Sequence, residues 1–449
     1  MKKQGNVVRK TKEILILAVV LLLTSGWLLT VYSLAVDKDL QAQTALIQSA
    51  EEFLEDKLYI RAVSKYKEAL TGYQTERNGE IEKGLLDIYK TGGMWEDYYD
   101  LLESRVSGER AGAEEYMILA EHFVEEENPG NGVVYLEQGR RLFPDNEELI
   151  SMDESLRYEY AAADTAFQML GIYTEDDMIP AFDGEKWGYI LKNGRTAIAF
   201  QYEEATRFSG EYAVVKLDGI YTLIDKNGYW NAVDKNGLDQ VASICGKRIV
   251  GVKDGKYGIY TNTFQPVSQV SYEGAYLSGN GYAFVKKGGK WALLDESMEQ
   301  VTDFVFEDVV PNSRQEVFYK DYGVVADQSG YYLVRPDGEA WFGARFAAAK
   351  GIESGLVAVA DEEGRWGFCD ETGAVIVDFQ YEDGLSFSSR LGAVRYAGKW
   401  GYINRYNTMV VGNDYKAAWP FAGDTAVVMD QKGNCGVLTL KYFDIYMGQ

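Results

Sequence analysis

The pattern of hydrophobic and polar residues divides the chain into three stretches that predict different kinds of structure. Residues 14–36 form a nearly unbroken apolar run without a charged side chain. From about residue 43 to residue 171, apolar residues recur at intervals of three and four, the spacing of one face of an α-helix. Beyond residue 175, short alternating runs are separated by turn dipeptides such as Asn193-Gly194, which indicates β-strands.

The apolar run of residues 14–36 is long enough to cross a bilayer as a helix, which needs about 20 residues. Five basic residues precede it: Lys2, Lys3, Arg9, Lys10 and Lys12. Because positive charges favour the cytoplasmic side, we expect residues 1–13 to be a cytoplasmic tail and all that follows the span to lie outside a bacterial cell membrane. A cleaved signal peptide is the alternative, since Ser33-Leu34-Ala35 could be its cleavage site, but its apolar segment would be shorter, about 7 to 15 residues.

The helical stretch, residues 43–171, contains a pattern with a period of 36 residues. Its first copy, Tyr59 to Leu70, reads Y-x-x-A-V-x-x-Y-x-x-A-L, in which small Ala residues on one face let a neighbouring helix approach closely. Weaker copies begin at Trp95 and Asn131. This pattern resembles tetratricopeptide repeats, and the resemblance implies stacked helices with a concave surface for peptides or partner domains. An ordinary bundle of helical hairpins is the alternative.

An aromatic motif recurs eight times in the β-stretch. Trp187-Gly188-Tyr189 is repeated at Trp366-Gly367 and Trp400-Gly401, with close variants at Tyr257-Gly258 and Trp291-Ala292 and degenerate copies at Tyr221, Tyr332 and Cys435. The spacing is 34 to 36 residues except between Trp291 and Tyr332, where it is 41 because of an insertion around residues 311–315. A period of this length is typical of repeat architectures.

Each copy predicts a meander of three or four strands in which Trp187 and Tyr189 share one face of the sheet and Gly188 lies on the other. Glycine at that position leaves room for a neighbouring sheet or ring to come close. We therefore expect a set of structural motif residues that serve packing: Trp187, Gly188, Tyr257, Gly258, Trp291, Trp366, Gly367, Trp400 and Gly401.

The motif, its period and the trailing Tyr-Glu and Gly-x-Ala-Val-Val segments resemble the WG-repeat family over residues 175–449. Small meanders cannot bury both faces alone, so they must close into a propeller or stack as an open solenoid. Closure protects strand edges and favours an all-β propeller of about eight blades, with seven as the alternative. We expect a strand near residues 171–174 to complete the last blade. The resemblance implies an interaction module without a defined ligand.

The charge and the cysteine content restrict the classes of partner and cofactor that the protein could bind. The net charge is −24, and residues 37–180 carry 13 Lys and Arg against 33 Asp and Glu. This surface repels nucleic acid and favours a basic partner. Three cysteines, Cys245, Cys369 and Cys435, lack the close pairing of a zinc site, so we expect core residues and no metal or other cofactor, with one disulfide pair as the alternative.

Candidate catalytic chemistry is sparse. The single histidine, His122, lies in the helical stretch, which argues against Ser-His-Asp or Cys-His catalysis and His-ligated zinc in the β-stretch. Four glutamates follow Tyr or Phe at one repeat position, so a closed propeller would place them in a ring: Glu203, Glu273, Glu307 and Glu382. Facing a channel, they could bind a cation or sugar or supply the carboxylate pair of a glycosidase; capping of local turns is the alternative.

The sequence as a whole predicts a non-catalytic scaffold, held in the cell membrane by a single span, that binds proteins or peptides outside the cytoplasm. The alternative is a cell-wall carbohydrate-binding protein or a carboxylate-dependent glycoside hydrolase. That alternative depends on the high Tyr and Trp content and on the ring of glutamates.

Overall fold

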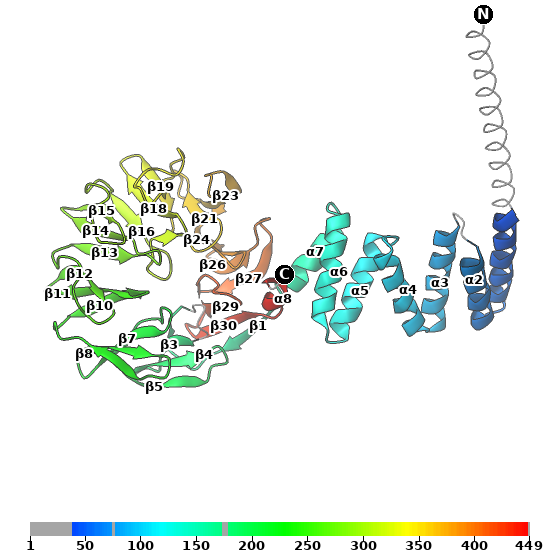
Figure 1. Ribbon diagram of the computed structural model, residues 1–449, viewed down its shortest axis with the longest axis horizontal. Helices are drawn as coiled ribbons and strands as arrows, with labels where there is room; N and C mark the ends of the chain where they lie inside the picture. Colours follow the sequence, from blue (N-terminus) through cyan, green and yellow to red (C-terminus); the bar gives the residue numbers. More distant parts are fainter. Residues whose placement is uncertain (1–37, 74–76, 173–177, 448–449) are drawn as a thin grey trace, which may run out of the picture. The chain divides into compact units, whose positions relative to one another are not determined.

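The computed structural model describes residues 38–73, 77–172 and 178–447 (Figure 1). The chain divides into two compact units, Met1–Asp153 and Glu154–Gln449. The predicted membrane span, residues 14–36, lies outside the described residues. None of the helices in the described part of the chain is long and apolar enough to cross a membrane.

The first unit is made of α-helices joined by short turns. Residues 38–55 are helical. The helices that follow are α2 (Tyr59–Gly72), α3 (Asn78–Gly92), α4 (Trp95–Ser107), α5 (Ala113–Glu125), α6 (Pro129–Leu142) and α7 (Glu147–Arg157), the last of which crosses the boundary between the units.

The helices of this unit form repeats. A residue in the left-handed conformation precedes the start of α2, α4 and α6 by two positions: Lys57 at φ 57°, Gly93 at φ 70° and Glu127 at φ 58°. Ala62 and Ala69 of α2 are fully buried, as small residues at a close helix contact should be. The prediction of a helical repeat region is therefore confirmed.

A buried group of ions lies among α3, α4 and α5. The Arg105 side chain is 2% exposed and pairs with Glu82 at 2.8 Å and with Glu115 at 2.5 Å. Its Nη2 also donates to the Arg110 carbonyl at 2.9 Å. One guanidinium thus compensates two carboxylates and a carbonyl, which its planar set of donors allows.

The second unit is a β-propeller. Its described residues contain eight antiparallel sheets arranged in a ring, the blades of Figure 1. The first four blades are β2–β5 (Met169–Leu170, Met178–Phe182, Trp187–Leu191, Thr196–Tyr202), β6–β9 (Glu204–Ala205, Tyr212–Leu217, Ile220–Asp225, Trp230–Val233), β10–β12 (Gln240–Cys245, Arg248–Lys253, Lys256–Thr261) and β13–β15 (Gly274–Leu277, Ala283–Lys287, Lys290–Leu294).

The other four blades complete the ring. They are β16–β19 (Asp308–Val310, Phe318–Tyr319, Tyr322–Asp327, Gly330–Val334), β20–β23 (Ala348–Ala349, Val357–Ala360, Trp366–Cys369, Val375–Tyr381), β24–β27 (Asp383–Ser388, Leu391–Tyr396, Lys399–Ile403, Met409–Tyr415) and β28–β30 (Ala417–Ala418, Thr425–Met429, Cys435–Leu440) with β1 (Tyr160–Asp164). Helix α8 (Phe443–Met447) follows the last strand. The prediction of a propeller with about eight blades is confirmed.

The last blade is closed by β1, which pairs antiparallel with β30 from Tyr160–Leu440 to Asp164–Gly436. Closure by a strand that precedes the first motif was predicted, but near residues 171–174, and the helical stretch was predicted to continue to residue 171. Both predictions were wrong. The segment 160–164 is mostly alanine, which favours a helix, and its pairing with β30 overrides that preference.

The core of the propeller lies between neighbouring blades. The Tyr189 ring in β4 meets Phe208 of the next blade at 4.9 Å between centroids, and Tyr402 in β26 meets Phe421 in the same way at 5.0 Å. Both tyrosines are fully buried, and each hydroxyl donates to a backbone carbonyl of that next blade. The first aromatic residues of these motifs are only half-buried: Trp187, Trp366 and Trp400.

Candidate functional site

The glycine of the repeat motif makes room for a bulge in the next strand of its own sheet. Between β4 and β5 the pairing advances from Trp187–Tyr202 to Tyr189–Ile198, two residues on one strand against four on the other. A Cβ atom on Gly188 would lie 2.9 Å from the Ile198 carbonyl oxygen. Such a distance is too short for any side chain, so the bulge requires glycine here.

The same geometry recurs in blades six and seven. A Cβ on Gly367 would lie 2.5 Å from the Val377 carbonyl oxygen, and one on Gly401 would lie 2.7 Å from that of Val411. In the second blade, where Thr222 replaces glycine, the strands pair through this position without the four-residue bulge. The glycine therefore accommodates backbone of the same sheet in all three blades. At Gly188 it also leaves room for an aromatic ring, as the sequence predicted, because a Cβ there would lie 2.9 Å from Cγ of Phe200.

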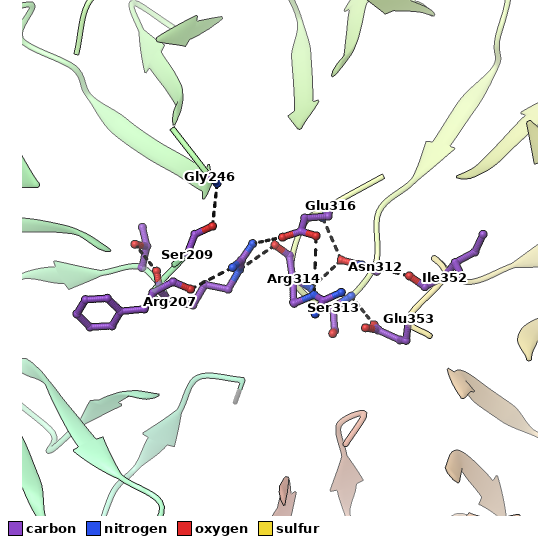
Figure 2. Close-up of polar contacts among 11 residues, drawn as sticks. Arg207, Ser209, Gly246, Asn312, Ser313, Arg314, Glu316, Ile352 and Glu353 are labelled. Atoms are coloured by element: carbon purple, nitrogen blue, oxygen red, sulfur yellow. Dashed lines mark hydrogen bonds and ion pairs between the residues drawn. The ribbon is translucent and has the colours of Figure 1, made fainter. Parts of the chain in front are cut away.

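The insertion that lengthens one repeat lies in the middle of the ring of blades (Figure 2). Arg207, in the loop after β6, donates to the Arg314 carbonyl at 3.1 Å and pairs with Glu316 at 2.5 Å. The Arg207 and Glu316 side chains are each 14% exposed. Arg207 belongs to the second blade and the insertion to the fifth, so this ion pair joins blades that are not neighbours in the ring.

The insertion is held in a single conformation by Asn312. Its side-chain oxygen accepts two hydrogen bonds from later amides of the insertion, and its Nδ2 donates to the Ile352 carbonyl at 3.1 Å. The insertion also approaches Gly351 so closely that a Cβ there would lie 2.2 Å from the Pro311 carbonyl oxygen. The backbone between β20 and β21 thus supports the insertion from one side.

Glu353 is a buried carboxylate beside the insertion, 6% exposed. Its Oε1 accepts a hydrogen bond from the Ser313 amide at 2.7 Å, and Ser313 is the only donor to it among the described residues. Burial raises the pKa of Glu353, opposed by Ser313 and by the positive charge of Arg314. A buried carboxylate with one donor residue retains unused acceptor capacity.

A cavity of about 490 Å³ opens beside the insertion and Glu353. Its polar and aromatic wall includes Ser313, Lys350, Glu353, Asp383, Trp400 and Trp419. Lys350 pairs with Asp383 at 3.1 Å, and the same carboxylate accepts the Gly384 amide at 2.9 Å. The volume is within the range of about 300–1,000 Å³ that is usual for small-molecule sites.

The helical unit has a groove of its own, of about 460 Å³, formed by α4, α5 and α6. Stacked rings of Phe123 and Tyr135, 5.5 Å apart, line it together with Glu103, Glu109 and Arg141. Burial raises the pKa of the Tyr135 hydroxyl, and the Glu103 carboxylate adds to this shift. The groove combines an aromatic surface with more negative than positive charge.

Comparison with known protein families identifies the repeat. Residues 187–221, 257–291 and 366–400 match the family described as WG containing repeat. These stretches begin at three of the predicted aromatic motifs and extend to the next one. Three segments of the propeller are therefore similar to WG repeats. A search of curated proteins finds no match to the chain.

The chain is also similar to several solved structures. The WD40 domain of Pan2 from Neurospora crassa aligns at 11% identity and TM-score 0.37, over 64% of this chain and 96% of that one. BBS1N, in a complex with ARL6DN, aligns at 11% identity and TM-score 0.34, over 63% and 94%. The AfRom2 CNH domain aligns at 11% identity and TM-score 0.33, over 63% and 98%.

The four glutamates suggested by the sequence do not line the cavity of the propeller. Three accept hydrogen bonds from glycine amides in the turn between the second and third strands of their blades: Glu203 from Gly219, Glu273 from Gly288 and Gly289, and Glu382 from Gly398. Glu307 pairs with Lys290. The amides of Gly289 and Gly288 hold the pKa of Glu273 below its usual value. None of the four lines the cavity.

The cysteines of the propeller are buried and form no disulfide, as expected of core residues: Cys245, Cys369 and Cys435. Burial raises the pKa of Cys245 and of Cys369 to about 12, so these thiols stay protonated and unreactive at neutral pH. In the part of the chain that the structure describes, no group of three or more His, Cys, Asp or Glu residues could hold a metal ion.

The sequence did not single out Arg207, Glu353, Asp383, Lys350 or Trp419. One signal pointed to their neighbourhood, the repeat interval of 41 residues between Trp291 and Tyr332. The residues themselves come from four different blades or their loops, and nothing in the chain order shows that they meet.

Proposed function

We propose that the protein is an interaction scaffold, anchored in a membrane by one span, that binds a protein or peptide outside the cytoplasm through its helical repeats. The groove between α4, α5 and α6 carries this proposal. It offers the concave, partly aromatic surface that helical repeats use for extended segments. The WG-repeat propeller is a second binding unit of the scaffold.

The lining of the groove selects the kind of segment. Phe123 and Tyr135 supply an apolar face, and Asn131 and Gln138 supply amides that can bond to a peptide backbone. The groove is lined by two carboxylates, Glu103 and Glu109, and by one cation, Arg141. The helical unit as a whole is also strongly acidic. A basic segment with an aromatic or aliphatic side chain fits these contacts.

We expect a labelled basic peptide to bind the full chain more tightly than neutral or acidic peptides of equal length, measured by fluorescence anisotropy. Tyr135→Ala removes an aromatic anchor and should weaken binding about tenfold, because such anchors carry most of the energy of an interface. Raising the salt concentration should weaken the basic peptide most.

Trp95→Ala is the matched control, since Trp95 is an aromatic residue of the same unit, 50% exposed, that does not line the groove. Its peptide affinity should equal that of the unaltered protein. Equal binding of acidic and basic peptides, or equal losses in the two variants, would show that the groove is not the binding surface.

We propose the membrane anchor because residues 14–36 are apolar and basic residues precede them. We expect a protease added to intact cells to degrade the propeller without lysis of the cells. Immunoblotting of an epitope fused to the C-terminus measures how much of the propeller remains after protease treatment. A propeller that is digested only after lysis would overturn the proposed orientation.

A further inference from the structure

We propose that the cavity of the WG-repeat propeller beside residues 311–316 binds a neutral carbohydrate of mono- or disaccharide size. This site is separate from the peptide groove, and neither proposal depends on the other. It also differs from the ring of glutamates that first suggested a sugar ligand. Three of those carboxylates bind turn amides of their own blades, and Glu307 pairs with Lys290 of the preceding blade.

The aromatic wall of the cavity suits a sugar ring. Trp400 and Trp419, from neighbouring blades, both line it. The faces of a pyranose ring expose C–H groups, which pack on the electron-rich face of an indole, while the hydroxyls at the ring edge need polar partners. An indole is therefore an efficient surface for a ligand that is apolar on its faces and polar at its edge.

The polar wall supplies the partners of those hydroxyls. Glu353 has Ser313 as its only donor among the described residues, so it can accept further hydrogen bonds. The Lys350 ammonium, paired with Asp383 at 3.1 Å, has three donors and can serve the carboxylate and a ligand oxygen together. Acceptors and donors thus line the same cavity, and a hydroxyl group is a ligand that can use both.

The charges of the cavity disfavour other small ligands. Lys350 lines the wall and Arg314 lies near Glu353, so an organic cation would meet like charges. Glu353 and Asp383 oppose an organic anion in the same way. A neutral polyhydroxy compound avoids both repulsions and still satisfies the buried carboxylate.

The insertion beside the cavity is held in place by contacts within the protein. The insertion is held by the Asn312 hydrogen bonds, by its close approach to Gly351 and by the ion pair of Arg207 with Glu316 (Figure 2). Binding would therefore not require ordering of this loop, which reduces the entropic cost of association. An insertion that only connected two strands of the fifth blade would not need such fixation.

The test uses the purified full chain in a detergent without a sugar head group. Saturation-transfer difference NMR with cellobiose, maltose and N,N′-diacetylchitobiose should show transfer to at least one of these disaccharides. Choline, spermidine and gluconate serve as cationic and anionic probes and should show none. Glu353→Gln and Trp419→Leu should each weaken the binding of the recognised disaccharide at least about tenfold, because each removes a principal contact.

Two further variants separate loss of the site from loss of the fold. Gln315→Ala changes an exposed residue of the cavity wall and should weaken binding a few-fold, while Trp230→Leu, 61% exposed on β9, should not change it. Near-UV circular dichroism checks that each variant is folded. Absence of transfer to all three disaccharides, preference for choline, spermidine or gluconate, or unchanged affinity in folded Glu353→Gln and Gln315→Ala proteins would overturn the proposal.

Discussion

Replacement of Arg105 by methionine is expected to lower the free energy of unfolding of the helical unit by about 3–5 kcal/mol, the usual cost of removing one partner from a buried ion pair. The variant leaves the Glu82 carboxylate, 3% exposed, and the Glu115 carboxylate without their shared guanidinium. Arg110 still reaches Glu82 at 2.7 Å, but from an exposed position. Urea unfolding followed by circular dichroism at the helical band measures the loss.

Two comparison variants make this prediction specific. Lys83→Met removes a positive charge from an exposed position of α3 and should change stability by less than about 0.5 kcal/mol. Arg105→Lys keeps the charge but cannot form the same set of bonds to two carboxylates and a carbonyl, so we expect it to be destabilising as well. A loss below about 1 kcal/mol in Arg105→Met would show that the ion group contributes little.

Substitution of valine for Gly367 is expected to destabilise the propeller by about 3 kcal/mol, the upper end of overpacking costs. The new Cβ would lie 2.5 Å from the Val377 carbonyl oxygen and 3.0 Å from the Asp378 carbonyl carbon. These are backbone atoms of β23, so relief requires the bulge to move, and a change of side-chain rotamer does not suffice. Unfolding followed by tryptophan fluorescence reports on this unit, which contains most of the tryptophans.

The matched control for this substitution is Thr222→Val at the same repeat position in the second blade. Thr222 is 2% exposed and faces no four-residue bulge, so a valine fits without displacing the next strand. We expect a loss of about 1 kcal/mol or less. Equal losses at the two positions would mean that the bulge is not the reason for glycine in the motif.

The repeat pattern predicted much of the propeller because the strands and turns of each blade have recognisable local sequence patterns. The aromatic strand, the Asn-Gly turns and the period of about 35 residues appear in several copies, so a misread copy is corrected by the others. The β1 strand had no copy to compare. Its alanines are compatible with a helix, and only pairing with β30 decides their conformation.

The candidate site could be predicted only as a place where the repeats differ. The interval of 41 residues marked the insertion, but Asn312 and Glu316 show no unusual local pattern. The four glutamates had the opposite property, because their recurrence made them conspicuous. Three of them bind turn amides, which explains why a glutamate recurs at this position of the repeat. The recurring glutamates thus indicated how each blade is built. The one interval of unusual length indicated where the cavity lies.

By itself the sequence determined the two kinds of repeat, the aromatic strands and the acidity of the helical unit, because periodicity and charge are properties of neighbouring residues in the chain. The tertiary structure alone decided which strand closes the ring and that Arg207 meets Glu316 across 109 positions. It also decided that Glu353, Asp383, Trp400 and Trp419 line one cavity. Closure of the propeller brings these residues together although they are far apart in the chain. The local sequence preferences of single strands do not determine which blades lie close to one another.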